Sequence, residues 1–186
     1  MAKRKELKPK ICRECPTEFI PRTSMQIVCS PLCALKYERK RQAKAFKRSG
    51  RERLRTRSDW IKLAQAEFNR FIKLRDAELP CISCGVDKPT GGLRKDGFDA
   101  GHYRSTAAAP ELRFSELNVH KQCNQCNTFK SGNIVEYRIR LIDRIGEEKV
   151  AWLEGPHEPK KYTIEALKGI REKYKALCKE LISKEE

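Results

Sequence analysis

The sequence lacks any long hydrophobic run and has few acidic residues for its number of basic ones. No stretch of the chain approaches the ~18 consecutive apolar residues of a membrane-spanning helix. The basic N-terminus, MAKRKELKPK, is not followed by the apolar segment that a secretory signal peptide carries. We therefore expect no membrane association and a cytoplasmic protein.

The shortage of acidic residues leaves a large positive charge. Against 41 Lys and Arg there are 25 Asp and Glu, which gives a formal net charge of +16 over 186 residues. This excess predicts an anionic partner, and nucleic acid is favoured over an anionic membrane surface. The charge is densest in residues 36–58, which read as a linker or as a frayed helix interrupted at Gly50. We interpret this segment as an arm that tracks phosphates, with a flexible spacer as the alternative.

Cysteine is abundant, but its spacing does not favour disulfides. Eight of the nine cysteines form four close pairs, and only Cys178 stands alone, where we expect a packing thiol. Without an export signal, such pairs are typical of reduced thiolates that bind zinc tetrahedrally. The sequence therefore predicts two structural zinc ions. The ligand sets are Cys12, Cys15, Cys29 and Cys33 for the first, and Cys81, Cys84, Cys123 and Cys126 for the second.

The pattern predicts an α+β fold of small zinc-stabilised modules with flanking helices. Apolar spacing indicates a helix from an N-cap at Ser58 to a stop at Pro80, and Ser30 and Thr163 are further candidate N-caps. Two closing helices are expected over 134–154 and 164–184. The predicted domains are a four-cysteine zinc finger (1–38), a basic arm (39–58), a helix with a zinc-clamped core (59–133) and the C-terminal helices (134–186).

The segment between the two halves of the second cysteine set is unusual for a loop. It holds Asp99, His102, Asn118 and His120, and Asn127 follows the last cysteine. All five are of types that can bind a hard metal ion, accept a proton or orient a histidine. The pattern C-x2-C … D-A-G-H-Y … N-x4-C-x2-C-N-x2-K resembles the zinc-bearing HNH, or His-Me finger, endonucleases.

That resemblance implies a ββα-metal core and a role for each matching residue. His102 would be the general base, Asn118 its loop partner, and Asn127 a ligand of a catalytic Mg²⁺ or Mn²⁺ separate from the zinc. Many HNH enzymes carry a metal-binding Asp directly before the histidine, but here that position is Gly101. Asp99 could replace it if the strand is bulged or the loop is tight. His120 is either a second catalytic group or a structural histidine.

A tighter resemblance covers most of the chain. The N-terminal cysteine finger, the basic arm, CISCG, DAGHYRSTAAAPELRF, HKQCNQCN and KSGN followed by YRIRLIDRIG are similar, in this order, to the phage NinG (Rap) recombination proteins. The resemblance implies a structure-specific endonuclease that cuts branched recombination intermediates, such as Holliday junctions and D-loops, near the nucleoid of a bacterial host. Phage or host recombination proteins are implied as partners, and a two-fold junction would suit a homodimer.

Two other interpretations stay open from the residues alone. One is a non-catalytic zinc-finger protein that binds nucleic acid, and the other is an adaptor in recombination. Only the nuclease uses the His and hard-metal ligands inside the thiolate clamp. The candidate DNA-binding residues are Lys40, Arg41, Lys44, Lys47, Arg48, Arg51, Arg53, Arg55, Arg57, Arg104 and Lys130.

Overall fold

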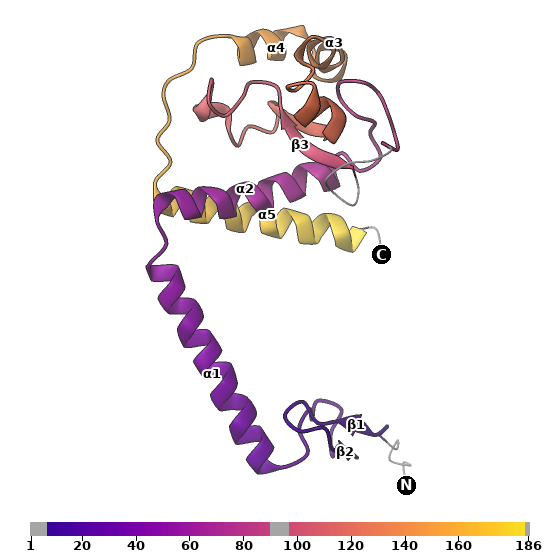
Figure 1. Cartoon of the computed structure of the whole chain (residues 1–186), viewed down its shortest axis with the longest axis vertical. Coiled ribbons are helices and arrows are strands. Elements are labelled where there is room, and N and C mark those ends of the chain that lie inside the picture. The colour runs from indigo at the N-terminus through magenta and orange to yellow at the C-terminus, as the bar shows by residue number, and fades with distance from the viewer. Residues whose placement is uncertain (1–6, 90–96, 185–186) are drawn as a thin grey trace. The chain divides into compact units, whose positions relative to one another are not determined.

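The computed structural model describes residues 7–89 and 97–184, and of residues 51–53 it describes the backbone alone. The chain forms two compact units, Met1–Arg55 and Thr56–Glu186 (Figure 1). This division differs from the predicted boundaries at 38/39 and 58/59, because one continuous helix joins the cysteine finger to the basic arm. No helix in the described ranges is both long and apolar enough to cross a membrane.

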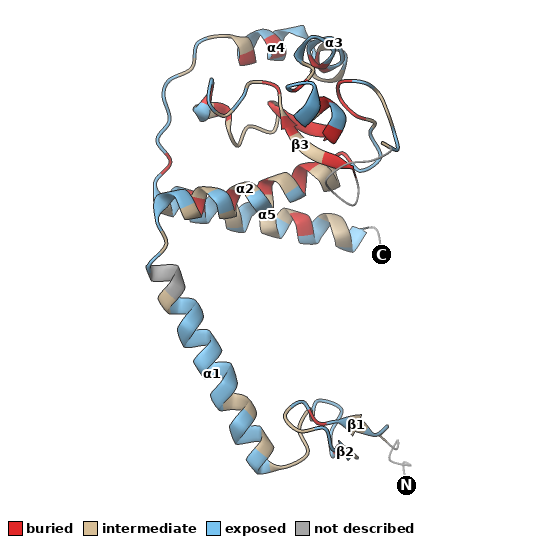
Figure 2. Ribbon diagram, in the orientation of Figure 1, coloured by how far each residue is buried: buried red, intermediate tan, exposed pale blue. Residues whose placement is uncertain are grey.

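The first unit is a small finger followed by a long helix. Strands β1 (Lys10–Ile11) and β2 (Glu18–Phe19) pair antiparallel. Helix α1 (Pro31–Arg53) begins as predicted, because the Ser30 hydroxyl accepts a hydrogen bond from the Cys33 N–H at 3.2 Å. The predicted interruption at Gly50 is wrong, since the helix runs through it. Most of α1 is exposed (Figure 2), so its basic side chains lie in solvent.

The second unit is built on two helices that pack along each other. Helix α2 (Arg57–Arg75) begins slightly earlier than predicted, because Thr56 and Asp59 form a capping box in place of a cap at Ser58. Helix α5 (Ile164–Lys184) begins as predicted after Thr163, whose hydroxyl accepts from the Ala166 N–H at 3.1 Å. An aromatic cluster joins the two helices, with the ring of Tyr174 4.8 Å from Phe68 and 5.1 Å from Phe71.

A two-stranded hairpin lies against this helix pair. Strands β3 (Phe98–His102) and β4 (Val119–Cys123) pair antiparallel without a bulge, from Phe98 opposite Cys123 to His102 opposite Val119. Val119 packs into the core formed with α2 and α5. The short 3-10 helix η1 (Pro110–Leu112) lies in the connection between the strands, and the π-helix η2 (Gln125–Phe129) follows β4. The hairpin is thus followed by a short π-helix where the HNH resemblance implies a regular helix, and the ββα-metal assignment stays a prediction.

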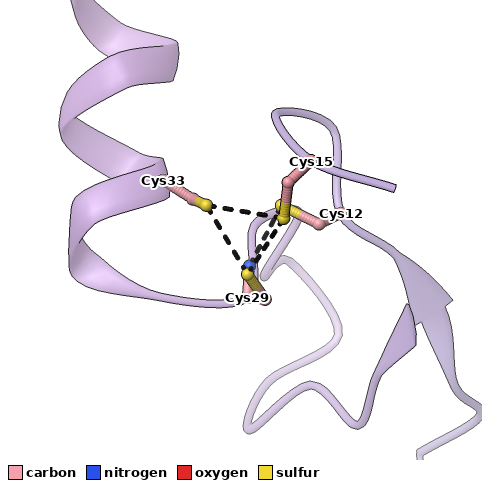
Figure 3. Close-up of side chains that lie close together, drawn as sticks. All are labelled: Cys12, Cys15, Cys29 and Cys33. Carbon is pink, nitrogen blue, oxygen red and sulfur yellow. Dashed lines mark hydrogen bonds between the residues drawn. The ribbon is translucent and has the colours of Figure 1, made fainter. Parts of the chain in front are cut away.

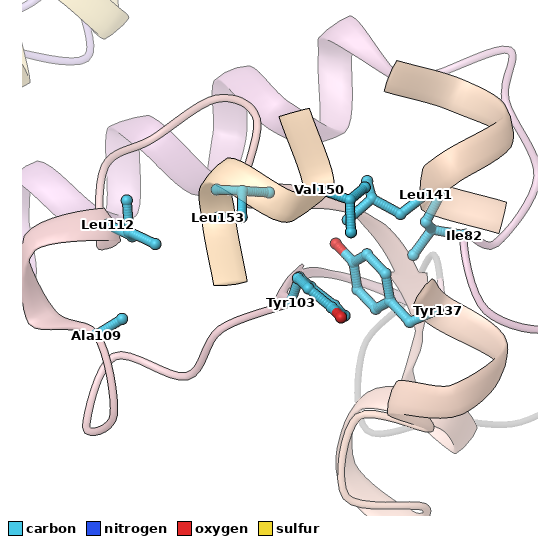
Figure 4. Packing of buried hydrophobic residues seen from close by; sticks show 8 residues of the cluster. All are labelled: Ile82, Tyr103, Ala109, Leu112, Tyr137, Leu141, Val150 and Leu153. Atoms are coloured by element: carbon cyan, nitrogen blue, oxygen red, sulfur yellow. The ribbon is translucent and has the colours of Figure 1, made fainter. Parts of the chain in front are cut away.

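The buried residues of helices α3 (Ile134–Ile145) and α4 (Glu147–Glu154) form a core with Ile82 and with Tyr103, which directly follows β3. The single helix predicted over 134–154 is wrong, because Gly146 adopts a φ of 90° that breaks it in two. Tyr137 of α3 is fully buried, and its hydroxyl donates to the Gly101 carbonyl at 3.0 Å. Figure 4 shows Tyr137 and Tyr103 facing the apolar side chains of both helices. The hydrogen bond from Tyr137 to Gly101 holds α3 against β3.

Candidate functional site

The first cysteine set converges on one point (Figure 3). The sulfur of Cys15 lies 3.5 Å from that of Cys29 and 3.6 Å from that of Cys33, and the last two are 3.6 Å apart. A tetrahedral zinc with Zn–S bonds of ~2.3 Å requires sulfur separations near 3.8 Å, so these residues fit a zinc ion. Backbone N–H groups of Glu14 and Cys29 donate to the Cys12 sulfur, each at 3.4 Å, as is usual around a thiolate.

The second cysteine set joins segments far apart in the chain. Cys81 and Cys84 follow α2, whereas Cys123 ends β4 and Cys126 lies in η2. The sulfurs of Cys84 and Cys123 are 3.7 Å apart, and the Cys123 N–H donates to the Cys81 sulfur at 3.3 Å. These four residues also fit a zinc ion. All eight predicted ligands are thus grouped as the spacing predicted, while Cys178 is buried and donates weakly to the Glu67 carbonyl at 3.9 Å.

His102 is the last residue of β3. Its Nε2 lies 3.0 Å from the backbone carbonyl of Arg113. Because a carbonyl only accepts hydrogen bonds, Nε2 must carry the proton, which leaves a lone pair on Nδ1. Burial lowers the pKa of His102 and the charge of Arg113 lowers it further, against the opposing effect of the carbonyl. The imidazole is therefore neutral at physiological pH and held in the tautomer that can accept a proton at Nδ1.

Asn118 acts on the loop that follows His102. It is fully buried and its Oδ1 accepts from the Arg104 N–H at 2.8 Å. Its Nδ2 donates to the carbonyls of Arg104 and Leu112, at 3.0 and 3.2 Å. Since the start and the middle of the connection between the strands are both tied to this one amide, Asn118 fixes the course of the loop that carries the Arg113 carbonyl to His102. The HNH resemblance implies a loop-steadying role for Asn118, which these contacts allow and which stays a prediction.

Asp99 lies in β3, the strand that ends at His102, and it pairs with Asn127 of η2. The Asn127 Nδ2 donates to the Asp99 Oδ2 at 3.2 Å. No bulge is needed for this contact, since η2 brings Asn127 back against β3. A carboxylate and an amide oxygen are donors that suit Mg²⁺ or Mn²⁺, which usually complete their coordination with water and substrate phosphate. The donor set therefore fits one hard divalent cation.

Gly101 departs from the HNH pattern for a steric reason. A Cβ at this position would lie 2.9 Å from both the Cβ and the Cδ of Gln122, and closer still to its Oε1. Gln122 is fully buried, and its Nε2 donates to the Ser83 hydroxyl at 2.7 Å and to the Gly132 carbonyl at 2.5 Å. The Gln122 side chain thus occupies the space that an Asp at position 101 would need.

His120 lies in β4, opposite Gly101, and is 3% exposed. Arg75 lies 3.1 Å from its Nδ1, and its Nε2 lies 3.2 Å from the Leu117 carbonyl. An arginine only donates and a carbonyl only accepts, so His120 is neutral with its proton on Nε2. Burial lowers the pKa of His120, in accord with this state, although the carboxylate of Asp76 at 3.7 Å opposes the shift. With both ring nitrogens engaged, this geometry favours the structural alternative.

A cleft of about 650 Å³ opens beside β3, whose residues Ala100 and His102 line it. His102 and Asn127 both line it, and so do Arg104 and Arg113; His120 does not. Among the described residues that line it, none is acidic. Such a cleft suits an anionic substrate placed against His102.

Sequence reasoning missed part of this lining. Gln65 and Asn69 of α2 lie in the cleft, although the apolar stripe predicted α2 only as a core helix. Their spacing of four residues, along one side of the apolar stripe, is the signal that could have found them. Ser131, which lines the cleft too, has a φ of 49°, as expected for a tight turn after η2.

The predicted DNA-binding residues fall into several groups. Lys44, Lys47 and Arg48 are exposed on α1, whereas Lys40 pairs with Glu14 at 2.5 Å and Arg41 with Glu38 at 2.9 Å. Two others lie beside the candidate active site, since Lys130 is exposed just after η2 and Arg104 lines the cleft. Arg55 is partly buried, and the Arg57 Nε donates to the Tyr162 carbonyl at 2.8 Å. The side chains of Arg51 and Arg53 lie outside the described residues.

Comparison with known proteins assigns the chain to a family. The model of the family described as "Bacteriophage Lambda NinG protein" matches residues 3–185, which is almost the whole chain. The chain belongs to the NinG family.

Curated relatives include "Protein ninG" of Escherichia phage lambda, 44% identical over 90% of each chain. "Protein ninG" of Escherichia phage 933W is 43% identical over 97% of this chain and 96% of its own. That of Salmonella phage P22 is 43% identical over 90% of each. No solved structure matches the chain.

Proposed function

We propose that this NinG-family protein is a metal-dependent, structure-specific DNA endonuclease that cuts branched recombination intermediates. The observation that carries the proposal is the state of His102. It is a neutral imidazole whose Nε2 is bound to a carbonyl, in a cleft that Asn127 also lines and that has no acidic residue among its described lining residues. Asn127 is in turn hydrogen bonded to Asp99, which lies on the same strand as His102. A zinc-binding module that only binds DNA has no need of this combination.

Each residue of the site then has a defined task in phosphodiester hydrolysis. His102 accepts the proton of the attacking water at Nδ1, while the Arg113 carbonyl holds the ring through Nε2. Asn118 keeps the loop in place, and Arg104 attracts the phosphate. When bound by Asp99 and Asn127, Mg²⁺ or Mn²⁺ supplies stabilisation of the charge on the phosphate and on the leaving 3′-oxygen.

The rest of the chain supplies binding. The exposed cations of α1 suit contacts with DNA phosphates outside the cleft, which would explain why a small catalytic unit carries a separate basic helix. Branched DNA is the substrate that the NinG family implies, and a homodimer would place two clefts on a two-fold junction. Contacts with phage or host recombination proteins are part of the same proposal.

The test is cleavage of a four-way junction, a D-loop and linear duplex, each with and without Mg²⁺. We expect cleavage of branched DNA that requires the metal. His102→Ala should lower the rate by roughly two to four orders of magnitude. DNA affinity should stay unchanged, because phosphate contacts dominate binding. His157→Ala, which removes a histidine outside the cleft, is the matched control and should cut normally.

Two outcomes would contradict the proposal. A His102→Ala protein that cuts at the normal rate would remove the active site from this cleft. A wild-type protein that binds branched DNA tightly but cuts no substrate with Mg²⁺ or Mn²⁺ would instead support the non-catalytic zinc-finger alternative.

A further inference from the structure

A second groove, of about 510 Å³, adjoins the candidate active site along the exposed face of α2. The two concavities share Gln65, Asn69 and Arg113 as lining residues. The other residues that line the α2 groove are Ile61, Lys62, Ala66, Arg70 and Lys73. With Arg113, the groove has four cationic side chains and, among the described residues that line it, no acidic one.

The cations of the α2 groove lie in one stripe because of their spacing. Lys62, Arg70 and Lys73 are eight and three residues apart, which places them on one face of a helix with 3.6 residues per turn. The opposite face carries Phe68 and the other buried residues of α2. At ~1.5 Å per residue the stripe is ~16 Å long, which is long enough to contact more than one phosphate of a DNA strand.

A chain of contacts connects the stripe to the proposed general base. The Arg113 guanidinium donates to the Gln65 Oε1 at 3.3 Å, and the Gln65 Nε2 donates to the Asn69 Oδ1 at 2.7 Å. The backbone carbonyl of the same Arg113 holds His102. Arg113 therefore lies where the cleft and the α2 groove meet. Its carbonyl contacts His102 in the cleft, and its side chain contacts Gln65 of α2.

We propose that the α2 groove binds the DNA strand that flanks the scissile phosphate. Lys62, Arg70 and Lys73 contact successive phosphates, and Arg113 contacts the phosphate nearest the cleft. A row of cations interleaved with amides fits an extended polyanion such as a DNA strand. Because the groove is continuous with the cleft, the strand that it binds is the one that is cut in the cleft. The proposal rests on the proposed nuclease function and adds a binding surface separate from the basic residues of α1.

The first test compares two full-length triple variants. The groove variant carries Lys62→Gln, Arg70→Gln and Lys73→Gln, and the control carries Lys149→Gln, Lys179→Gln and Lys184→Gln, which remove three exposed cations elsewhere in the same unit. Binding to a four-way junction is measured without added Mg²⁺ over a range of salt concentrations. The slope of log K against log salt should fall by about 0.9 for each duplex phosphate that the protein no longer neutralises, hence by roughly 2 to 3 for the groove variant. Equal slopes for the two variants would overturn the proposal.

The second test locates the DNA. A photoreactive p-benzoylphenylalanine is placed at Ala66 inside the groove, or at the exposed Ala176 on α5 as the control. Crosslinks from position 66, but not 176, should map to nucleotides on one side of the cleavage position. Absence of a crosslink at 66 in a protein that still binds the junction would overturn the proposal.

The two proposals fail in distinguishable ways. A protein that cuts branched DNA, yet shows the same slope for both triple variants, keeps the nuclease and loses the α2 groove. A protein that crosslinks through position 66 and responds to the groove variant, yet cuts nothing, keeps the groove as a DNA-binding surface and loses the nuclease.

Discussion

Gly101→Ala should destabilise the second unit, although it adds one methyl group. The added Cβ would lie 2.9 Å from two carbons of Gln122 and closer to its Oε1, well inside ordinary contact distance. Gln122 has no room to yield, because its Nε2 is hydrogen bonded to Ser83 and Gly132 and its side chain is fully buried. The new methyl must therefore expel the Gln122 amide or separate the strands.

The magnitude follows from what the Gln122 amide would lose. Each of its two hydrogen bonds contributes ~1 kcal/mol net, and leaving a buried amide unpaired costs about 1–3 kcal/mol. Overpacking a filled core by itself costs about 1–3 kcal/mol. We expect Gly101→Ala to lower the free energy of unfolding by about 3 kcal/mol, which corresponds to a fall of roughly 10 °C in the melting temperature of a unit of this size.

Thermal and urea unfolding, followed by circular dichroism, would measure this loss. Gly169→Ala on α5 is the matched control, since nothing lies within 4 Å of its added Cβ, and it should stabilise by about 0.5–1 kcal/mol. Gln122→Ala removes the atoms that clash most. The double variant should therefore be more stable than the sum of the two single losses by about 2 kcal/mol. A Gly101→Ala protein that melts with the wild type would refute this account of why Gly occupies the position.

Three further predictions concern the metals and the proposed base. Protein purified without added zinc should contain close to two zinc ions per chain by elemental analysis; one or none would contradict the two four-cysteine sites. Asp99→Ala and Asn127→Ala should each lose cleavage that high Mg²⁺ or Mn²⁺ partly recovers, whereas His102→Ala should not be recovered, and equal recovery of all three would contradict the assigned roles. Cleavage should hold as pH falls to the usual histidine pKa of ~6.5 and decline only below it, because burial lowers the pKa of His102 and its neutral form is the active one. A decline that begins above pH 7 would contradict this state.

Much of the helical frame could be predicted because each core helix has an apolar stripe and a recognisable cap. The prediction for α2 differed at both ends. Thr56 and Asp59, three residues apart, already form a capping-box pattern at its start, and the helix ends at Arg75, before the predicted stop at Pro80. Glycines were harder to interpret. Gly50 lies in an open stretch of α1, where even an added Cβ would have no neighbour within 4 Å, and the helix tolerates it, whereas Gly146 takes a positive φ and ends α3. Glycine thus continues one helix and ends another, and the backbone conformation at each position decides which.

The candidate site could be predicted where a residue's role depends on local sequence, and not where it depends on packing. Cysteine spacing sufficed for both thiolate clusters, because zinc geometry fixes which spacings converge. The burial of His120 and the presence of Gln65 in the cleft required the tertiary structure, since both depend on how α2 packs on the hairpin. The contact between Asp99 and Asn127 likewise depends on η2, a π-helix that the sequence pattern did not indicate.

The hairpin explains why a thiolate cluster and a candidate reaction site share one small segment. A two-stranded sheet is marginally stable by itself. Here hydrogen bonds to the β4 backbone stabilise the hairpin. The Lys121 N–H donates to the Asp76 carboxylate, and the Lys121 carbonyl accepts from the Ile82 N–H, both at 3.0 Å. Cys123 at the end of the same strand belongs to the second thiolate set. Because stability is supplied from the β4 side, β3 needs no further strand on its other edge, and His102 at its end can line an open cleft.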